Sequence, residues 1–216
     1  MEQIIQDLIS PQINGFNEFT PKLRVAVLAS GEGTNFQELV NLSKNNLLDI
    51  EIKILITNKI NAGCIRRANE SDIPFICIDH LKYSTKKEFE QEIINVLLKN
   101  NIELIVMAGW MRVVSETFVN TFKNKIINIH PSILPSFKGK SPIQDALNNK
   151  SLITGCSVHF VEKEVDNGKL LIQGAIRIEP NDNLKSLTRK MHKLEHKILP
   201  YGVSEAGFFI RNKLGI

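Results

Sequence analysis

An amide and an imidazole stand two positions apart at Asn128 and His130, directly after an apolar run and before a loop that contains Pro131 and Pro135. In a strand, side chains two residues apart point to the same side, so these two groups converge on one spot. An amide N–H and a protonated imidazole both donate to an oxygen that gains negative charge, and the imidazole can also transfer a proton. A lone histidine is more often structural, but the neighbouring amide in a stiff loop favours stabilisation of an oxyanion.

A carboxylate that could support this pair is Asp166, in the sequence Asp166-Asn167-Gly168. Asp-Asn-Gly is itself a common turn sequence, and composition alone favours that simpler interpretation. If Asp166 lies beside His130, its charge favours the protonated imidazole. Ser157 and His159 alternate along the preceding apolar run, and they either brace the site or fill the interior.

A glycine-rich turn, Ser30-Gly31-Glu32-Gly33-Thr34-Asn35, joins an apolar run to a helical pattern. Its glycines allow a tight turn and a close approach to an anion, and the start of a helix offers free N–H groups. Phe36 occupies the third glycine position of a dinucleotide loop, and no GK[ST] follows. The turn therefore predicts a site for one phosphate rather than for a dinucleotide, with a plain tight turn as the alternative.

The elements that position these groups alternate between strands and helices. Strands are expected at 24–29, 51–57, 74–78, 104–108 and 125–129, and helices at 35–45, 62–69 and 86–98. Such alternation predicts βαβ units and a mainly parallel sheet, whose ligands bind beyond the carboxyl ends of the strands. Two later runs, 155–161 and 170–176, have no helix between them, which predicts an antiparallel pair. The predicted class is α/β, with a single Rossmann-like, open sheet flanked by helices and an antiparallel strand addition in the C-terminal part.

Both ends of the chain carry helical patterns. A final helix is expected from a cap near Asp182, and it kinks or ends at Pro200. Its expected buried residues are Leu184, Leu187, Met191, Leu194 and Ile198. Residues 1–22 are expected to be an N-terminal extension, in which the apolar residues of 4–9 form one side of a short helix that ends at Pro11. We favour the interpretation that this segment packs on the domain or is mobile, and we disfavour the alternative that it is a helix that binds a partner.

Composition narrows the classes of function. The chain has 216 residues, 43% of them hydrophobic, and its 27 basic and 23 acidic side chains are scattered, which argues against nucleic-acid binding. The dispersed Cys64, Cys77 and Cys156 predict a reducing compartment, and no cluster of metal ligands occurs, so we expect no metal. We expect no membrane association and a cytoplasmic location, because neither a targeting signal nor a membrane-spanning run is evident.

Four motifs, in order, resemble those of the glycinamide ribonucleotide transformylases (phosphoribosylglycinamide formyltransferases), a folate-dependent family of purine biosynthesis. They are Ser-Gly-x-Gly-Thr-Asn at 30–35, Ala-Gly-Trp-Met-Arg at 108–112, Asn-Ile-His-Pro-Ser-Ile-Leu-Pro at 128–135, and Ser-Val-His-Phe-Val with a following Asp-x-Gly at 157–168. The likeness extends from about Leu23 to about Phe208. It implies a formyltransferase domain at 23–216 that follows the extension.

The resemblance also implies roles for particular residues and the identity of the co-substrate, 10-formyltetrahydrofolate. It implies a catalytic trio of Asn128, His130 and Asp166. The phosphoribosyl group of the substrate would bind at Gly33, Thr34 and Asn35, and its glycinamide end would meet the carboxylate of Glu195. The pterin pocket would be lined by Met111, Arg112, Val113, Val114 and Asn128. Lys86 replaces a family arginine near the folate tail and keeps its charge without the planar donor pair. The partners are then small molecules, and the chain is a monomer or a homodimer.

In the implied reaction, the glycinamide amine attacks the formyl carbon while Asn128 and His130 hold the oxyanion. Methionyl-tRNA formyltransferase shares the motif core but adds a C-terminal tRNA-binding domain, whereas we expect only one helix and a short tail after Ile178. The main alternative is formyltetrahydrofolate deformylase, which has an N-terminal regulatory domain and a second histidine where this chain has Pro131. A noncatalytic Rossmann-like binding module would need the glycine-rich turn but has no use for Asp166 beside the other two groups.

Overall fold

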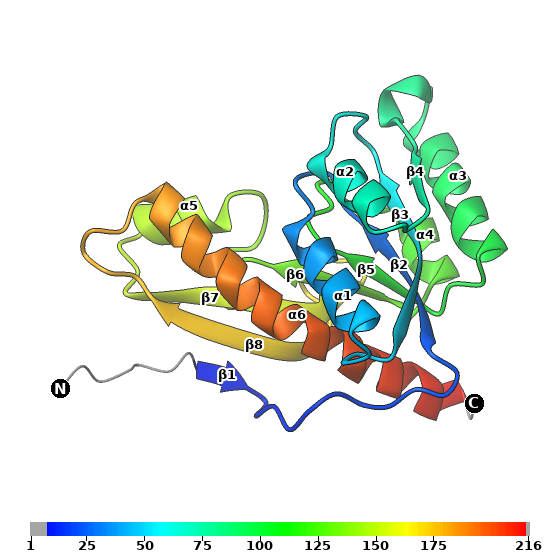
Figure 1. The fold of residues 1–216 in the computed structure, drawn as a ribbon. Coiled ribbons are helices and arrows are strands. Elements are labelled where there is room, and N and C mark those ends of the chain that lie inside the picture. Colours follow the sequence, from blue (N-terminus) through cyan, green and yellow to red (C-terminus); the bar gives the residue numbers. More distant parts are fainter. Residues whose placement is uncertain (1–7, 215–216) are drawn as a thin grey trace.

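The computed structural model describes residues 8–214, and within that range eight strands form one sheet in the order β1-β8-β7-β6-β5-β2-β3-β4 (Figure 1). The strands are β1 (Leu8–Ser10), β2 (Leu23–Leu28), β3 (Ile50–Thr57), β4 (Phe75–Cys77), β5 (Leu104–Met107), β6 (Ile126–His130), β7 (Ile153–Phe160) and β8 (Leu170–Arg177). The helices are α1 (Thr34–Lys44), α2 (Gly63–Glu70), the 3-10 turn η1 (His80–Lys82), α3 (Lys86–Lys99), α4 (Glu116–Thr121), α5 (Pro142–Asn148) and α6 (Leu184–Leu214).

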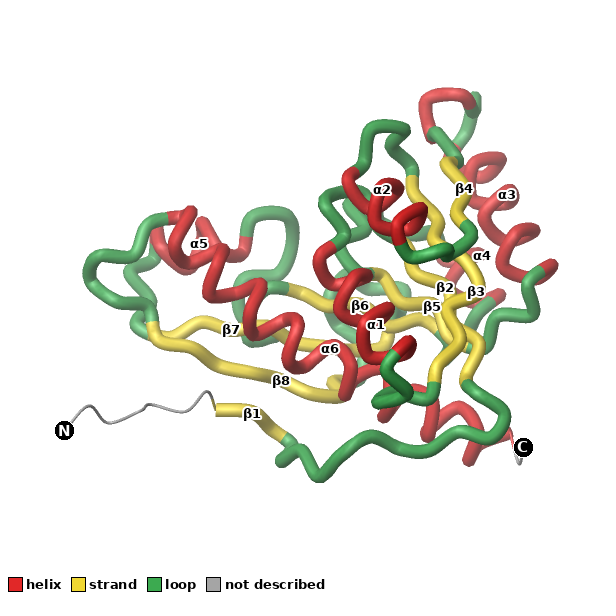
Figure 2. Tube along the Cα trace, in the orientation of Figure 1, coloured by secondary structure: helices red, strands yellow, loops and turns green. Residues whose placement is uncertain are grey.

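The sheet has a parallel half and an antiparallel half. Strands β6, β5, β2, β3 and β4 run parallel to one another, whereas β7, β8 and β1 are added antiparallel beyond β6. The sequence prediction of a mainly parallel sheet with an antiparallel addition is confirmed. Figure 2 shows the two halves as one continuous layer of strands between the helices.

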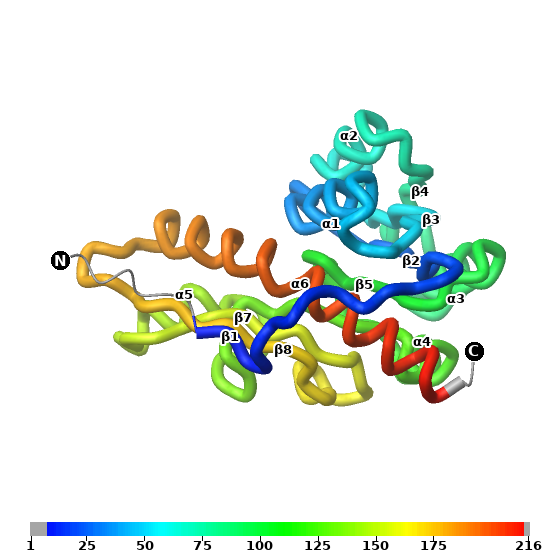
Figure 3. Tube along the Cα trace, turned by 60° about the horizontal axis from the view of Figure 1, so that its bottom comes forward, coloured from blue at the N-terminus to red at the C-terminus, as the bar shows by residue number. Residues whose placement is uncertain are grey.

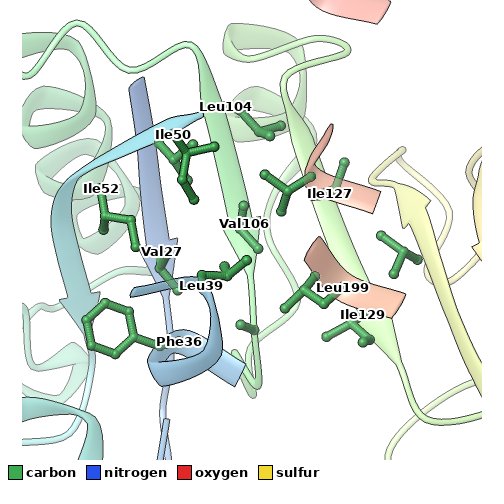
Figure 4. Packing of buried hydrophobic residues seen from close by; sticks show 14 of the residues in the cluster. Val27, Phe36, Leu39, Ile50, Ile52, Leu104, Val106, Ile127, Ile129 and Leu199 are labelled. Carbon is green, nitrogen blue, oxygen red and sulfur yellow. The ribbon is translucent and has the colours of Figure 1, made fainter. Parts of the chain in front are cut away.

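Apolar side chains alternate along the buried strands and fill a core on each face of the sheet. In β2, Val25 and Val27 face α1, α2 and α6, whereas Ala26 and Leu28 face α3 and α4. Figure 4 shows Phe36 and Leu39 of α1 beside Val27 on the first of these faces. The helices on both faces fix the strands, so the loops at the carboxyl ends of the strands project from a rigid base.

Helix α6 runs past Pro200, where the sequence pattern predicted a kink or an end. A proline inside a helix removes one hydrogen bond and crowds the preceding turn, which costs about 3 kcal/mol. The helix continues because its next turns are buried on the sheet through Val203, Ala206 and Ile210. Its start is capped by Asn183, whose Oδ1 accepts from the Ser186 N–H at 3.0 Å, one position later than the expected cap.

The predicted N-terminal helix is wrong for Leu8 and Ile9, which belong to β1, while Ile4 and Ile5 lie outside the described residues. Strand β1 pairs with β8, with Ile9 opposite Gly174. Ile9 packs against the core and Leu8 is exposed, so the segment has the alternation of an edge strand. Pairing with the edge of β8 stabilises this segment as a strand, whereas an isolated helix of this length is only marginally stable in water.

Residues 8–22, which we call the N-terminal strap, continue from β1 along α6 (Figure 3). The Asn17 N–H donates to Ser204 Oγ at 2.7 Å, and the ring of Phe16 lies 4.4 Å from that of Tyr201. Phe19 is buried in the core. The strap therefore packs on the domain, one of the two arrangements expected from the sequence.

Candidate active site

A cavity of about 840 Å³ opens at the carboxyl ends of the parallel strands and extends over β6 and β7. The predicted site residues that line it are Gly33, Thr34, Asn35, Met111, Arg112, Val113, Val114, Asn128, His130, Asp166 and Glu195. They come from three loops, from the start of α1, from β6 and from α6. The structure thus brings together every predicted site residue except Lys86.

Asn128 and His130 both lie on β6, and the register places His159 of β7 opposite Asn128. Asn128 Nδ2 is 3.4 Å from His159 Nε2. His130 Nδ1 is 3.4 Å from Asp166 Oδ2, and His159 Nε2 is 3.7 Å from Asp166 Oδ1. One carboxylate therefore lies between two imidazoles, with the amide beside the second.

Asp166 has a φ of 52°, in the left-handed region, and its turn directs the carboxylate inward. Burial by itself raises the pKa of the Asp166 carboxyl, but the hydrogen bonds from His159 and from the Gly139 N–H, with the charge of His130, outweigh burial and lower it. The group is held as a carboxylate. The negative charge of Asp166 thus lies 3.4 Å from His130 Nδ1.

Both nitrogens of His130 face acceptors. Nδ1 faces Asp166, and Nε2 lies 2.9 Å from the carbonyl oxygen of Phe137. A neutral imidazole has one N–H, whereas the imidazolium has two and donates to both neighbours. The geometry therefore suits a positively charged His130 that donates from either nitrogen.

The loop after β6 is supported from β7 and β8. Ser157 Oγ donates to the Ser132 carbonyl at 2.7 Å and accepts from the Leu134 N–H at 3.0 Å. Gln173 Nε2 donates to the Leu134 carbonyl at 3.0 Å. Of the two sequence-based alternatives for Ser157 and His159, bracing of the site fits these contacts.

The glycine-rich turn ends at the first residues of α1. Gly33 has a φ of 70°, and a Cβ atom there would lie 2.5 Å from Cys64 Cβ, so both the backbone and the space require glycine. No side chain caps the start of α1, and its first turn carries no acidic residue. The first N–H groups of the helix are therefore free for an anion at this end of the cavity.

Across the cavity from the trio, Asn35 Nδ2 donates to Glu195 Oε2 at 2.9 Å. Glu195 is only 7% exposed, and burial raises the pKa of its carboxyl to about 7, against the opposing effect of the Asn35 hydrogen bond. Asn35 Oδ1 is buried with no hydrogen-bond partner among the described residues. This end of the cavity thus presents a weakly acidic carboxyl and an acceptor, which suit a ligand amine or amide.

The segment that follows β5 presents apolar side chains at the cavity mouth. Met111 is 75% exposed, and Val113 is exposed as well. Lys86 does not line the cavity; its Nζ lies 3.7 Å from Glu90 Oε1, which accepts from the Ser115 N–H at 2.9 Å. Its contact with a folate tail stays a prediction.

Sequence reasoning missed other residues that line the cavity. His192 stands three positions before Glu195 and so lies on the same side of α6, a spacing that could have revealed it. Burial lowers the pKa of His192. The segments 139–144 and 161–165 also contribute, and neither carries a local signal, because only the pairing of β6, β7 and β8 brings them to the cavity.

A model of the formyl transferase family matches residues 23–203. With the sheet and the cavity described above, this match shows that the chain belongs to the formyl transferase family. Enzymes of this family use a formyl-folate as co-substrate.

Among the relatives, the phosphoribosylglycinamide formyltransferase of Bacillus subtilis is 38% identical over 177 residues, which cover 82% of this chain and 91% of that protein. The solved phosphoribosylglycinamide formyltransferase from Bacillus halodurans has a TM-score of 0.82 at 34% identity, and the match covers 88% of this chain and 96% of that one. The trifunctional purine biosynthetic proteins of Chironomus tentans and Gallus gallus are both 40% identical to this chain, and the matches cover 83% and 84% of it, respectively. The matches cover 13% and 18% of those longer proteins. The resemblance stated from the motifs is confirmed.

The described part of the chain contains no helix long and apolar enough to cross a membrane. Over the same residues, no group of three or more His, Cys, Asp and Glu side chains is arranged to hold a metal ion.

Proposed function

We propose that this chain transfers the formyl group of 10-formyltetrahydrofolate to the terminal amine of 5-phosphoribosylglycinamide. The products are formylglycinamide ribonucleotide and tetrahydrofolate. The observation that carries the proposal is the cluster of Asn128, His130 and Asp166 in the same cavity as a free helix start. The names of the relatives at 34–40% identity agree with this reaction.

The cavity offers a place for each part of the two reactants. The N–H groups at Gly33, Thr34 and Asn35 suit the phosphate, and Glu195 suits the glycinamide end. The segment of Met111, Arg112, Val113 and Val114, in which Met111 and Val113 are exposed, suits the pterin. Two reactants held together in this way react without the entropic cost of a bimolecular encounter.

In the reaction, the neutral amine attacks the formyl carbon, and the electron pair of the C=O bond moves to the oxygen. Asn128 Nδ2 and the imidazolium of His130 donate to this oxyanion, while Asp166 holds the positive charge on the imidazole. The nucleophilic nitrogen loses its proton, and the folate nitrogen gains one as its bond to the formyl carbon breaks. In the structure, Nε2 of His130 donates to the Phe137 carbonyl, so the formyl oxygen has to replace that acceptor, because Nδ1 faces Asp166.

Hydrolysis of the formyl-folate is the second candidate, because the same oxyanion site serves attack by water. The free start of α1 favours the transferase, since a phosphorylated acceptor uses it and water does not. The two are separated by a spectrophotometric assay of folate product release, run with and without the ribonucleotide. Release that depends on the ribonucleotide supports the transferase, and equal release without it means that water is the acceptor.

Asn128→Ala tests the catalytic assignment. Loss of one oxyanion donor lowers turnover by about 10²–10³, and we expect this loss with normal folding. Asn120→Ala, at an exposed asparagine of α4, is the matched control and should keep full turnover. Near-normal turnover of Asn128→Ala contradicts the assignment.

A further inference from the structure

A row of hydrogen bonds crosses the carboxyl ends of four neighbouring strands. The Met111 N–H, beyond β5, donates to Ser30 Oγ at 3.1 Å, and this hydroxyl, beyond β2, donates to Asn58 Oδ1 at 2.7 Å. Asn58 Nδ2, beyond β3, lies 3.4 Å from Nδ1 of His80, beyond β4. Because these strands are adjacent in the order β5-β2-β3-β4, the row follows the edge of the sheet. We call Ser30, Asn58 and His80 the carboxyl-edge brace.

The inner members of the brace are buried residues whose side chains make their hydrogen bonds, among the described residues, within the row. Ser30 is 4% exposed and Asn58 is 2% exposed. A buried amide or hydroxyl destabilises the fold unless it is hydrogen-bonded, so a specific network at this position fixes the parts that it joins. Neither Asn58 nor His80 is among the described residues that line the cavity. The brace therefore acts on the site through Met111.

Met111 needs such a contact because its own side chain does not fix its position. That side chain is 75% exposed, and the residue lies in the irregular segment between β5 and α4, after Gly109 with a φ of 79°. Within a strand the backbone would be held by the ladder, but here Ser30 Oγ accepts the hydrogen bond from the Met111 N–H.

Aromatic contacts hold the residues on either side of Met111 to the outer end of the brace. The ring of Trp110 stacks on that of Phe89 at 6.3 Å with an interplanar angle of 3°. The guanidinium of Arg112 lies 5.3 Å from the centre of the same Phe89 ring, and the edge of His80 meets it at 6.2 Å. Trp110 and Arg112 thus contact the Phe89 ring, which lies against His80 of the brace, and Met111 between them bonds to Ser30 of the brace.

We propose that Ser30 and Asn58 are positioning residues that hold the Met111 backbone for the formyl-folate, with His80 as the outer support. The inference rests on the proposed function, because it assigns the segment at Met111 to the folate. The brace touches the segment through the Met111 amide, so it acts on folate binding. Ser30 also begins the glycine-rich turn at the phosphate end, whereas Asn58 lies outside that turn and tests the folate effect alone. In Ser30→Ala the backbone bond from the Ser30 N–H to the Gly109 carbonyl, at 3.0 Å, is retained.

The test compares Ser30→Ala, Asn58→Ala and the double variant by steady-state kinetics. We expect Ser30→Ala to raise the KM for 10-formyltetrahydrofolate about tenfold, the upper range for one hydrogen bond. We expect Asn58→Ala, outside the glycine-rich turn, to raise the same KM and to leave the KM for the ribonucleotide and kcat unchanged. The double variant should be no worse than Ser30→Ala, because both changes break the same row. Equal rises of both KM values in Asn58→Ala, no rise at all, or effects that multiply in the double variant would overturn the proposal.

Ser204→Ala is the matched control, because Ser204 is also a buried serine whose hydroxyl accepts a backbone N–H, that of Asn17 at 2.7 Å. It should lower stability and leave both KM values unchanged. A second readout is hydrogen exchange at the Met111 amide, which needs no turnover. Faster exchange in Ser30→Ala and in Asn58→Ala, but not in Ser204→Ala, supports the brace, and unchanged exchange overturns it. Absence of formyl transfer by the wild-type chain would overturn the proposed function alone, and the Met111 exchange would still decide whether the brace exists.

Discussion

Replacing Glu195 by glutamine tests whether burial governs the ionisation of this carboxyl. Burial raises the pKa from the ordinary 4.5 to about 7, so the folded state holds the proton more tightly than the unfolded state does. Because each pKa unit corresponds to about 1.4 kcal/mol, an ionised Glu195 destabilises the folded state by about 3 kcal/mol. Wild-type stability should therefore fall as the pH rises from 4.5 to about 7, and the full penalty should persist above that window.

Glutamine keeps the size and the acceptor oxygen but does not ionise. At about pH 5, Glu195→Gln and the wild type should have similar free energies of unfolding, and at about pH 8.5 the variant should be more stable by up to about 3 kcal/mol. Urea unfolding followed by the fluorescence of the single, buried tryptophan, Trp110, measures both values. Glu18→Gln, at an exposed glutamate of the strap, is the control and should show no such difference. A stability difference for Glu195→Gln that does not change with pH refutes the reasoning.

Asp166→Asn should lower kcat by about tenfold or more, because the neighbouring His130 imidazole loses its negatively charged partner, and steady-state kinetics measure the loss. Gly33→Ala should raise the KM for the ribonucleotide and spare that for the folate, since a methyl group at this φ of 70° meets Cys64 at 2.5 Å; equal changes in both KM values contradict this. Gly207→Ala should lower the free energy of unfolding by about 1–3 kcal/mol, because its Cβ would lie 2.7 Å from the Phe19 ring. Its kcat should stay normal, and a loss of kcat without a loss of stability contradicts this prediction.

The convergence of Asn128 and His130 was predictable from the sequence, because the two-residue period of a strand fixes which side chains share a side. The contact of Asp166 with His130 was not predictable from local pattern, since it depends on the antiparallel pairing of β7 and β8 and on the turn between them. The motif resemblance supplied that contact. His192 could also have been predicted, because it stands three positions before Glu195 and side chains at that spacing lie on the same side of a helix.

The elements that sequence reasoning misjudged are those whose conformation depends on a distant partner. Residues 8–10 form a strand because they pair with the edge strand β8. The local sequence of residues 8–10 does not indicate that such a partner is nearby. Pro200 stays within α6 because the sheet buries the following turns, which outweighs the local penalty. The carboxyl-edge brace combines residues that follow three different strands, β2, β3 and β4, and has no motif of its own.

The contacts between the strap and α6 join residues that the ribosome adds at widely separated times. Asn17 and Ser204 are separated by 187 positions, and α6 covers the face of the sheet that also receives α1 and α2. While the ribosome adds residues at about 5–20 per second, the part of that apolar face that α6 covers stays exposed until α6 has been made. The parallel strands are complete well before the helix that supplies Glu195. The nascent chain therefore depends on protection of this face, and the cavity gains its glycinamide end only when α6 docks.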